Sequence, residues 1–356
     1  MKRALKVVAL MSLLSLMSSP VFAQIGNLNN LLRGGVDDAE LLVRAYLEPF
    51  GNGFGADLNS SWYTSAKSHG FLGFDLTVSA NAAIAPESDR SFDFNALGLQ
   101  NMRLAPGASQ TSPTIVGEDE LGPQVEVVLE NNVVGSFNLP KGIGFRYVPS
   151  PMVQASVGVF DGTDVTLRFF PEVKLGDDVG RIKMFGIGAK HSLNSYLPGG
   201  DLLPIDLAVM VGITKFQAEA DLDVQPESGV PGALLGNAYE FQQVDLEANS
   251  FTLGLLVSKK LAMLTLFGGV GIERSSLDIK LEGMFPITLI ETQPGPTFGD
   301  PVIRNSENPV SISYTGSNSA RAQVGFQLDF LLIRFYGTYT LAEYPVLSGG
   351  LGLSFR

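Results

Sequence analysis

The chain has 356 residues, no cysteine, and a formal net charge of −12 from 24 Lys and Arg against 36 Asp and Glu. Proteins that bind nucleic acid need a basic surface, so this acidic balance argues against a nucleic-acid partner. The absence of cysteine excludes disulfides, a thiol catalyst and cysteine metal sites. With 40 Gly, 23 Phe and only 17% charged residues, the composition fits an exported β protein.

The first 23 residues have the pattern of a secretory signal peptide. A basic start is followed by an apolar run over residues 7–17, and the small residues Val21 and Ala23 precede an expected cut at Gln24. The run is too short to span a bilayer as a helix. We therefore predict export through a cleavable signal peptide, and no transmembrane helix in the mature chain.

One amphipathic helix is predicted after the signal peptide, over residues 37–47. Asp37 is the expected N-cap, with Glu40 completing a capping box, and Pro49 and Gly51 are expected to end the helix. A single short helix is unstable alone, so its apolar side chains must pack against something. These side chains are Leu41, Leu42, Ala45 and Tyr46. We predict that the helix lies in or just beneath a barrel lumen, as a plug.

From residue 71 onward, apolar residues recur with period two, as in β-strands. In the last ten residues the expected lipid-facing set is Leu351, Leu353 and Phe355, and the expected lumen-facing set is Gly350, Gly352 and Ser354. In the strands as a whole, one face is aliphatic and aromatic while the other carries charges and amides. The polar face includes Asp75, Gln154, Arg168, Asp206, Gln327, Asp329 and Arg334.

The connections between these strands alternate in length. Residues 160–164, 257–263 and 330–333 form short turns, whereas residues 86–142, 221–240 and 283–309 are long, polar and rich in Gly, Pro, Asn and Asp. Bacterial outer-membrane barrels place short turns in the periplasm and long loops outside. We therefore predict an all-β transmembrane antiparallel barrel in the bacterial outer membrane, rather than a secreted sandwich or soluble barrel. The expected partners are outer-membrane lipid and, through the C-terminal strand ending at Phe355, the barrel-assembly machinery.

Twelve strands are expected, within a range of ten to fourteen. Residues 124–129 and 133–139 are predicted to add one pair inside the first long connection. Near Asn249 and Arg274 the apolar residues change parity, which indicates either β-bulges or strands that leave the membrane for an extracellular extension. The chain is thus divided into a signal peptide, an N-terminal helix and plug over residues 24–69, and a barrel over residues 70–356.

Three segments resemble an uncharacterised family of outer-membrane proteins common in Bacteroidetes-type bacteria, and the resemblance covers most of the mature chain. They are GFLGFDL at 70–76, PSPMVQ through DGTD at 149–164, and HSL through LPIDLA at 191–208. That family has no established activity, so the resemblance implies a barrel and assigns no functional residue. The order of short helix, Gly/Asn-rich stretch and barrel is also similar in architecture to FadL-type transporters of hydrophobic compounds, in which an N-terminal segment plugs the lumen.

Catalysis and metal binding are not predicted, and no cofactor is expected. His69 and His191 are the two histidines. His191 and the adjacent Ser192 would point to opposite faces of a strand, so they cannot pair as base and nucleophile. Two histidines this far apart also make a poor metal site. The acidic loop over residues 117–120 could hold Ca²⁺ or reach lipid headgroups, but it is interpreted as a solvated loop.

The leading functional hypothesis is a passive channel or transporter for small solutes, with hydrophobic compounds as one class. Inward aromatic and apolar residues, with arginines that could meet a carboxylate, are the expected solute site. The lumen and solute candidates are Arg168, Phe170, Asp206, Met210, Phe216, Asp329, Arg334 and Tyr336. The inward charges could equally form a closed network that fills a narrow barrel. The alternative function is a structural or surface-interaction barrel that acts through its long extracellular loops, and an outer-membrane hydrolase is the least favoured.

Overall fold

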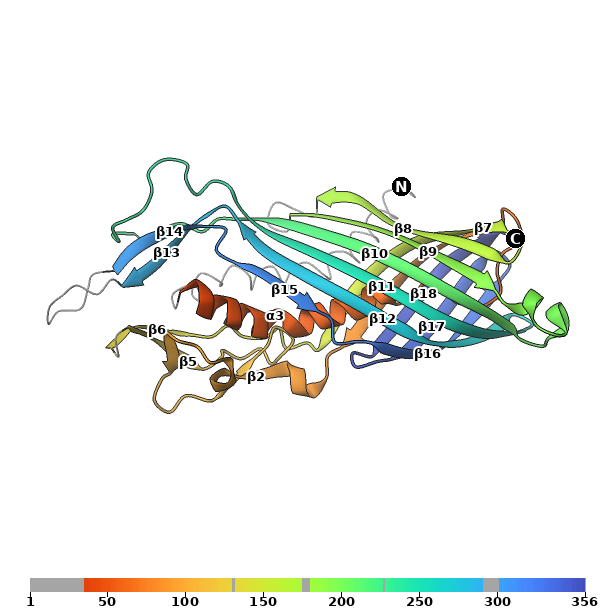
Figure 1. Cartoon of the computed structure of the whole chain (residues 1–356), viewed down its shortest axis with the longest axis horizontal. Helices are drawn as coiled ribbons and strands as arrows, with labels where there is room; N and C mark the ends of the chain where they lie inside the picture. The colour runs from red at the N-terminus through yellow and green to blue at the C-terminus, as the bar shows by residue number, and fades with distance from the viewer. Residues whose placement is uncertain (1–34, 130–131, 175–179, 227, 291–300, 356) are drawn as a thin grey trace.

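The computed structural model describes residues 35–355 except 130–131, 175–179, 227 and 291–300 (Figure 1). The predicted signal peptide over residues 1–23, and the start of the predicted plug region, lie outside this part of the chain. Among the described residues, no helix is both long and apolar enough to cross a membrane.

A closed antiparallel barrel forms the body of the molecule. In the part of the chain that the structure describes, ten strands follow one another around the ring, and pairing of β11 with β12 closes it. In ring order they are β1 (Phe74–Ile84), β7 (Tyr147–Phe160), β8 (Thr163–Lys174), β9 (Arg181–Ser192), β10 (Asp206–Leu222), β11 (Gln242–Leu261), β12 (Leu264–Glu282), β16 (Ala320–Phe330), β17 (Ile333–Leu341) and β18 (Val346–Phe355). The predicted transmembrane barrel is confirmed, at the lower end of the expected strand number.

The two strands predicted within the first long connection form outside this ring. They are β5 (Gln124–Leu129) and β6 (Asn132–Asn138), which join β3 (Met102–Leu104) in a separate sheet. Because β1 pairs with β7 along its whole length, from Phe74↔Val157 to Ile84↔Tyr147, no edge is left in the ring for them. The expectation of twelve barrel strands was therefore wrong by this pair.

The two ends of the barrel differ as the sequence predicts. The short-turn end carries the connections 161–162, 262–263 and 331–332, together with residues 193–205, which include η4 (Asn194–Tyr196) and η5 (Gly200–Leu202). The long-connection end carries the described parts of residues 85–146, 223–241 and 283–319, together with the short connection 342–345 between β17 and β18 (Figure 1). The C-terminus and the start of β1 lie at the short-turn end, where the rings of Phe74 and Phe355 stack with centroids 4.8 Å apart.

An apolar belt surrounds the outer face of the half of the barrel nearer the short-turn end. On β18, Leu351, Leu353 and Phe355 are 40–55% exposed, while Gly352 and Ser354 face the interior. Residues 251–261 of β11 span the belt, a length that suits a membrane strand of about 9–11 residues. An exposed aliphatic and aromatic surface that closes on itself around a polar interior is the pattern of a membrane barrel.

Toward the long-connection end, the same strands exchange the polarity of their two faces. On β12, the inward residues change from Thr265 and Glu273 to Leu277 and Ile279, while Lys280 now faces out. The β11–β12 register runs without a shift through this change. The parity changes near Asn249 and Arg274 are therefore not bulges. They mark where the strands leave the belt and continue as an extension with a soluble-type core.

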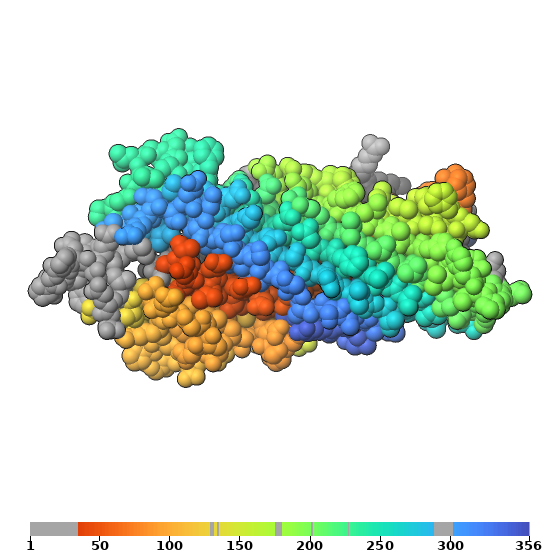
Figure 2. Space-filling model, viewed as in Figure 1, coloured from red at the N-terminus to blue at the C-terminus, as the bar shows by residue number. Residues whose placement is uncertain are grey.

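The extension encloses a large hydrophobic core with the other elements of the long-connection end. These elements are η2 (Glu87–Arg90), β2 (Ser91–Asp93), η3 (Phe94–Leu97), β3, β4 (Thr111–Pro113), β5, β6, β13 (Met284–Ile290), β14 (Pro301–Glu307) and β15 (Ser311–Thr315). Its centre is the helix α3 (Val36–Asn59), which lies between β15 and residues 86–146 (Figure 2).

Helix α3 is longer than predicted and begins differently. Asp37 does not cap it; instead the buried Asp38 accepts hydrogen bonds from the N–H groups of Gln100 and Asn101, at 2.9 and 2.7 Å. The helix continues through Pro49 and the following glycines into the lumen. A Cβ at Gly51 would lie 2.9 Å from Leu277 Cδ2, and one at Gly55 would lie 2.1 Å from Ser275 Oγ. The glycines therefore let the helix lie directly against β12, and this packing overrides their usual tendency to end a helix.

Candidate functional site

The upper half of the plug is helix α3, and most of its apolar side chains are removed from solvent. Leu42, Val43, Tyr46 and Leu47 are each at most 3% exposed. Tyr46 donates a hydrogen bond to the carbonyl oxygen of Lys141 at 2.8 Å. Burial raises the pKa of Tyr46 far above its usual range, so its hydroxyl stays protonated and keeps donating. Burying four such side chains stabilises this arrangement by about 6–12 kcal/mol.

The outer face of the helix departs from the expected packing. Leu41 is 38% exposed and Ala45 is half-buried, so the exposed stripe of the helix also contains Leu41, beside Arg44 and Glu48. The expectation that Leu41 is buried was wrong: part of the helix stays at the surface between β15 and residues 86–146 (Figure 2), and Leu41 is among its exposed residues.

The lower half of the plug is the segment of residues 60–73, which connects α3 to β1. Its anchor is Trp62, whose ring lies over Gly188 and Gly212, a directly paired couple on β9 and β10. A Cβ at either glycine would come within 2.7 Å of the ring, so only glycines leave room for it. On the other face of the ring, the Arg168 guanidinium carbon lies 3.6 Å from the ring centroid.

Arg168 is completely buried, and each of its three side-chain nitrogens donates a hydrogen bond within the chain. It donates to the carbonyl oxygen of Leu58 at 2.7 Å, to that of Ser60, and to Gln154 Oε1 at 3.1 Å. The carbonyls of a helix C-terminus lack partners within the helix, and a buried cation satisfies them well. Arg168 therefore binds the end of α3 to the wall, and because its side chain is completely buried it is not open to a solute carboxylate.

A second buried ion pair lies beside the end of the helix. Arg321 Nη1 lies 2.9 Å from Glu273 Oε2, and Arg321 also donates to the carbonyl oxygen of Asn59. Glu273 accepts a further hydrogen bond from Asn318 at 2.6 Å. Because both charged side chains are at most 8% exposed, each satisfies the other in a site that bulk water does not reach.

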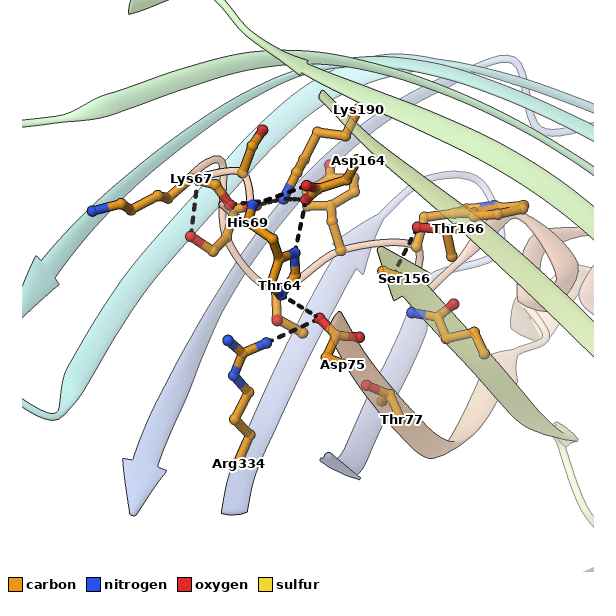
Figure 3. A pocket seen from close by; sticks show the side chains of 15 residues that line it. Thr64, Lys67, His69, Asp75, Thr77, Ser156, Asp164, Thr166, Lys190 and Arg334 are labelled. Carbon is orange, nitrogen blue, oxygen red and sulfur yellow. Dashed lines mark hydrogen bonds and ion pairs between the residues drawn. The ribbon is translucent and has the colours of Figure 1, made fainter. Parts of the chain in front are cut away.

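At the short-turn end, a chain of charged side chains fastens the lower plug to the wall (Figure 3). His69 Nδ1 lies 3.1 Å from Asp164 Oδ2, and His69 Nε2 lies 3.1 Å from Asp75 Oδ2. Asp164 is also 3.0 Å from Lys190, and Asp75 is 3.0 Å from Arg334. Lys190 in turn donates to the carbonyl oxygens of residues 65 and 67, at 3.0 and 2.9 Å. The inward charges were expected to form either a solute site or a closed network that fills the barrel. At this end of the barrel they form the closed network.

A small polar cavity of about 40 Å³ lies within this network. Its lining includes Trp62, His69, Asp164, Lys190 and Arg334 (Figure 3). A cavity of this size and polarity has room for a few water molecules, whereas sites for drug-sized ligands usually measure about 300–1,000 Å³. It is therefore a polar space of water size between the plug and the wall, not a site for an amphiphile.

The eight predicted solute residues are divided among separate parts of the interior. Phe170 and Phe216 pack in the upper core, where Phe216 meets the ring of Phe54 at 4.8 Å. Met210 belongs to the cluster around Trp62, and Tyr336 is buried in the lumen. Arg168 lies at the end of the helix, and Asp206 is half-buried near Ser258. Arg334 alone among the eight lines the cavity, and Asp329 lies 3.4 Å from it.

Several residues that build this interior were not singled out as site residues from the sequence. For Asp75 the signal was present, since it alternates with apolar residues on its strand. Asp164 and Lys190 also share the inward parity of their strands, Asp164 with Thr166 and Arg168 on β8 and Lys190 with Gly186 and Gly188 on β9, so the signal was present there too. For Trp62 there was none, because the plug segment has no periodicity. Glu273 lies at the change of parity, where the pattern of alternation fails.

The other residues considered from the sequence have structural partners. His191 Nδ1 lies 2.8 Å from Thr163 Oγ1, and its Nε2 lies 3.0 Å from the Tyr196 hydroxyl, so Ser192 is not its partner. In the acidic loop, Asp119 lies 2.6 Å from Lys141. Within the described ranges, no group of three or more acidic or histidine side chains is placed to hold a metal ion.

Comparisons with known proteins give a family. A family model described as "Family of unknown function (DUF6588)" matches residues 1–355. No curated protein matches the chain. Among solved structures, it is similar to the translocator domain of the autotransporter NalP from Neisseria meningitidis, at 12% identity and a TM-score of 0.28, covering 81% of this chain and 90% of that one.

Two further solved structures show the same degree of likeness. The attachment invasion locus protein Ail of Yersinia pestis, crystallised with a heparin analogue, has 10% identity and a TM-score of 0.26, covering 80% of this chain and all of that one. A Pseudomonas aeruginosa FadL homologue has 11% identity and a TM-score of 0.20, covering 85% and 96%. At such values these similarities say nothing about activity.

Proposed function

This chain belongs to the DUF6588 family, whose function is unknown, and we propose that it is a closed outer-membrane barrel that displays a folded unit at the cell surface for contact with external partners. The supporting observation is the position of α3. Its upper half is the centre of the core that unites the strand extensions with residues 86–146. Withdrawing the helix to open a channel would dismantle that core.

The orientation follows from the two kinds of connection. Long loops of bacterial barrels face outward and short turns face the periplasm. The extension, with its charged outer face and apolar interior, is then built for water above the membrane. The chain has no cysteine, so single cysteines report its orientation cleanly. In intact cells, Leu235→Cys (95% exposed, long-connection end) should react with a membrane-impermeant maleimide. Leu331→Cys, at the short-turn end, should react only after lysis and detergent extraction. The reverse pattern would invert the orientation.

A disulfide staple tests whether the upper plug moves. A Cβ at Gly51 would lie 3.7 Å from Leu277 Cβ, within the range of natural disulfides. Vesicles that contain the oxidised Gly51→Cys/Leu277→Cys protein should behave like vesicles with the native protein, with no solute uptake above that of empty vesicles. Uptake by the native protein that is lost on oxidation and restored by reductant would show that the helix moves, and display alone would no longer explain the fold.

Transport of small solutes is the second candidate, and the lower plug is what favours it. Residues 60–73 are held largely by hydrogen bonds and ion pairs around a small polar cavity, so water can replace their contacts if they shift. Ser65 Oγ lies 3.3 Å from Ser258 Oγ, which makes Ser65→Cys/Ser258→Cys the matched lower staple. If the barrel is a gated channel, this staple should lower planar-bilayer conductance, and reductant should restore it. Deleting residues 24–53 would be a less specific test, because it would remove the centre of the upper core as well.

A further inference from the structure

The connections at the short-turn end carry large apolar side chains in positions where turns that face water are usually polar. Within the described residues, the connections 193–205, 262–263 and 331–332 each have at least one, and the exposed Phe160 comes directly before the Asp161-Gly162 turn. Exposed side chains of this kind include Phe71, Phe160, Leu202, Met263, Leu331 and Leu332. Leu331 is fully exposed, at 102%, and Leu202 is 91% exposed. Turn tips in water favour Gly, Asn, Asp and Ser, so this end of the barrel is unusual in its chemistry.

The backbone makes these residues more unusual still. Leu72, Ala262 and Leu331 have φ values of 60°, 54° and 56°. These values lie in the left-handed region of the backbone, which residues other than Gly and Asn rarely adopt. Leu331 is the first residue of the two-residue connection between β16 and β17, where Asn or Gly would fit without strain. In water, both the strain and the exposure of Leu331 are unfavourable. An apolar medium around this tip would remove the cost of exposing the leucine side chain, although not the backbone strain.

The apolar belt of the barrel continues directly into these tips. Phe330 and Ile333, which flank the β16–β17 turn, are 47% and 46% exposed on the outer face, and the Phe330 ring packs against Phe335 at 5.9 Å. Beside this turn, on the neighbouring strands β18 and β1, the stacked pair of Phe355 and Phe74 ends the belt, and the N–H of Ser354 donates to the carbonyl oxygen of Leu332 at 2.8 Å. No charged rim separates the tips from the belt along these strands.

We propose that the turns at the short-turn end lie in the boundary between headgroups and acyl chains of the adjacent membrane leaflet, so that lipid rather than water covers them. Exposed Lys67 and Lys259 near this end have flexible stems that can carry their ammonium groups to lipid phosphates. The barrel would then be set deep on this side, with only its hydrated mouth open to the aqueous phase. This inference needs the barrel to lie in a membrane, but it holds for a display barrel and for a channel alike.

Quenching of tryptophan by brominated phosphatidylcholine tests this placement. The native Trp62 is 5% exposed inside the barrel and supplies the same background in every sample. Leu331→Trp is compared with Leu235→Trp, which has a similar exposure at the opposite end. In vesicles of lipid brominated high in the acyl chain, Leu331→Trp should lose at least twice as much fluorescence as Leu235→Trp, with emission at shorter wavelength. Acrylamide should quench Leu235→Trp more strongly.

Leu332→Trp repeats the measurement without the left-handed backbone, in case Leu331→Trp does not assemble. If tryptophans at both 331 and 332 respond like Leu235→Trp, unaffected by brominated lipid and quenched by acrylamide, lipid does not cover the tips and the proposal fails. The exposed leucines would then be available to a periplasmic protein, which is a different proposal. The readout does not depend on solute uptake or on surface binding, so it can fail separately from the proposed function.

Discussion

The two halves of the barrel are made from the same strands and have opposite chemistry. Near the short-turn end, β11 and β12 turn apolar side chains outward and polar ones inward; beyond Asn249 and Arg274, the same unbroken strands do the reverse. Since the register does not shift, the backbone does not cause the change. The surroundings do: lipid covers the first half, and water covers the second. A change of parity along a continuous strand therefore locates the edge of the membrane.

The plug follows the same division. In the extension, α3 is held by buried apolar side chains, whereas in the membrane half the end of the helix and residues 60–73 are held by Arg168, Arg321 and the network around His69. Breaking the apolar contacts exposes hydrophobic side chains to water, whereas breaking the polar contacts exchanges one set of hydrogen bonds for another. The upper plug is thus the more permanent part.

The largest expected effect comes from placing a charge inside the extension. Leu277→Asp removes a 2% exposed side chain beside Gly51 and leaves a carboxylate without a partner, which should destabilise the fold by about 5 kcal/mol. Denaturant unfolding in vesicles would measure this change. The control is Ser276→Asp on the outer face of the same strand, expected within about 0.5 kcal/mol. A cost below 1 kcal/mol for Leu277→Asp would mean that the extension lacks a soluble-type core.

The next largest effect concerns the polar contacts that hold the end of α3 in the membrane half of the barrel. Arg168→Ala leaves the carbonyls of Leu58 and Ser60 unpaired and removes the cation from the Trp62 ring, at a cost of about 3–4 kcal/mol. Arg168→Lys should not restore stability, because an ammonium cannot replace the planar guanidinium in this geometry. Thermal unfolding and a red shift of Trp62 emission would report the loss. Arg181→Ala, at an exposed ion pair, is the control, and an equal effect there would contradict the assignment.

A charge on the outer face of the belt should have a somewhat smaller effect. Leu351→Arg should cost about 2–4 kcal/mol if the residue lies near the bilayer midplane. The matched control is Gln243→Arg, which is also on the outer face but in the extension, and it should be near neutral. Folding titrations into vesicles measure both. Equal costs would mean that lipid covers both halves, or neither.

The smallest effect is a dependence on pH in the outer face of the extension. Burial, with the carboxylates of Glu282 and Glu219 nearby, raises the pKa of Asp245 above its ordinary value. A raised acid pKa means stability that is present below the ordinary pKa, near pH 4, and is lost as the pH rises through the folded value. Asp245→Asn should therefore stabilise the protein at neutral pH, by less than about 1 kcal/mol because solvent screens the site, and not at acid pH.

Glu247 lies two residues further along the same face of β11, and its effect on stability should depend on pH in the opposite way. A hydrogen bond from Lys215, 2.7 Å away, lowers its pKa. Its contribution is present above the ordinary pKa and is lost as the pH falls through the folded value. Glu247→Gln should therefore destabilise the protein at neutral pH, and the difference should shrink in acid. Melting temperatures measured from acid to neutral pH would compare the two, and the same sign for both variants would contradict these assignments.

The sequence by itself determined which residues face lipid. Period two puts successive side chains on opposite faces, so Leu351, Leu353 and Phe355 could be assigned without a structure, as could the inward direction of Arg168 and Arg334. The lengths of the connections sorted the two ends. These features are local, because each depends only on neighbours along the chain.

Only the tertiary structure decided how the interior is filled. The sequence offered Pro49 and Gly51 as the end of the helix, yet in the folded chain the glycines bring it against β12. It marked Arg168 as a lumen cation, but Leu58, Ser60 and Trp62, more than a hundred residues earlier, decide that this cation holds the plug instead of a solute. Such contacts join residues far apart in the chain, and alternation along a single strand carries no information about what lies across the lumen.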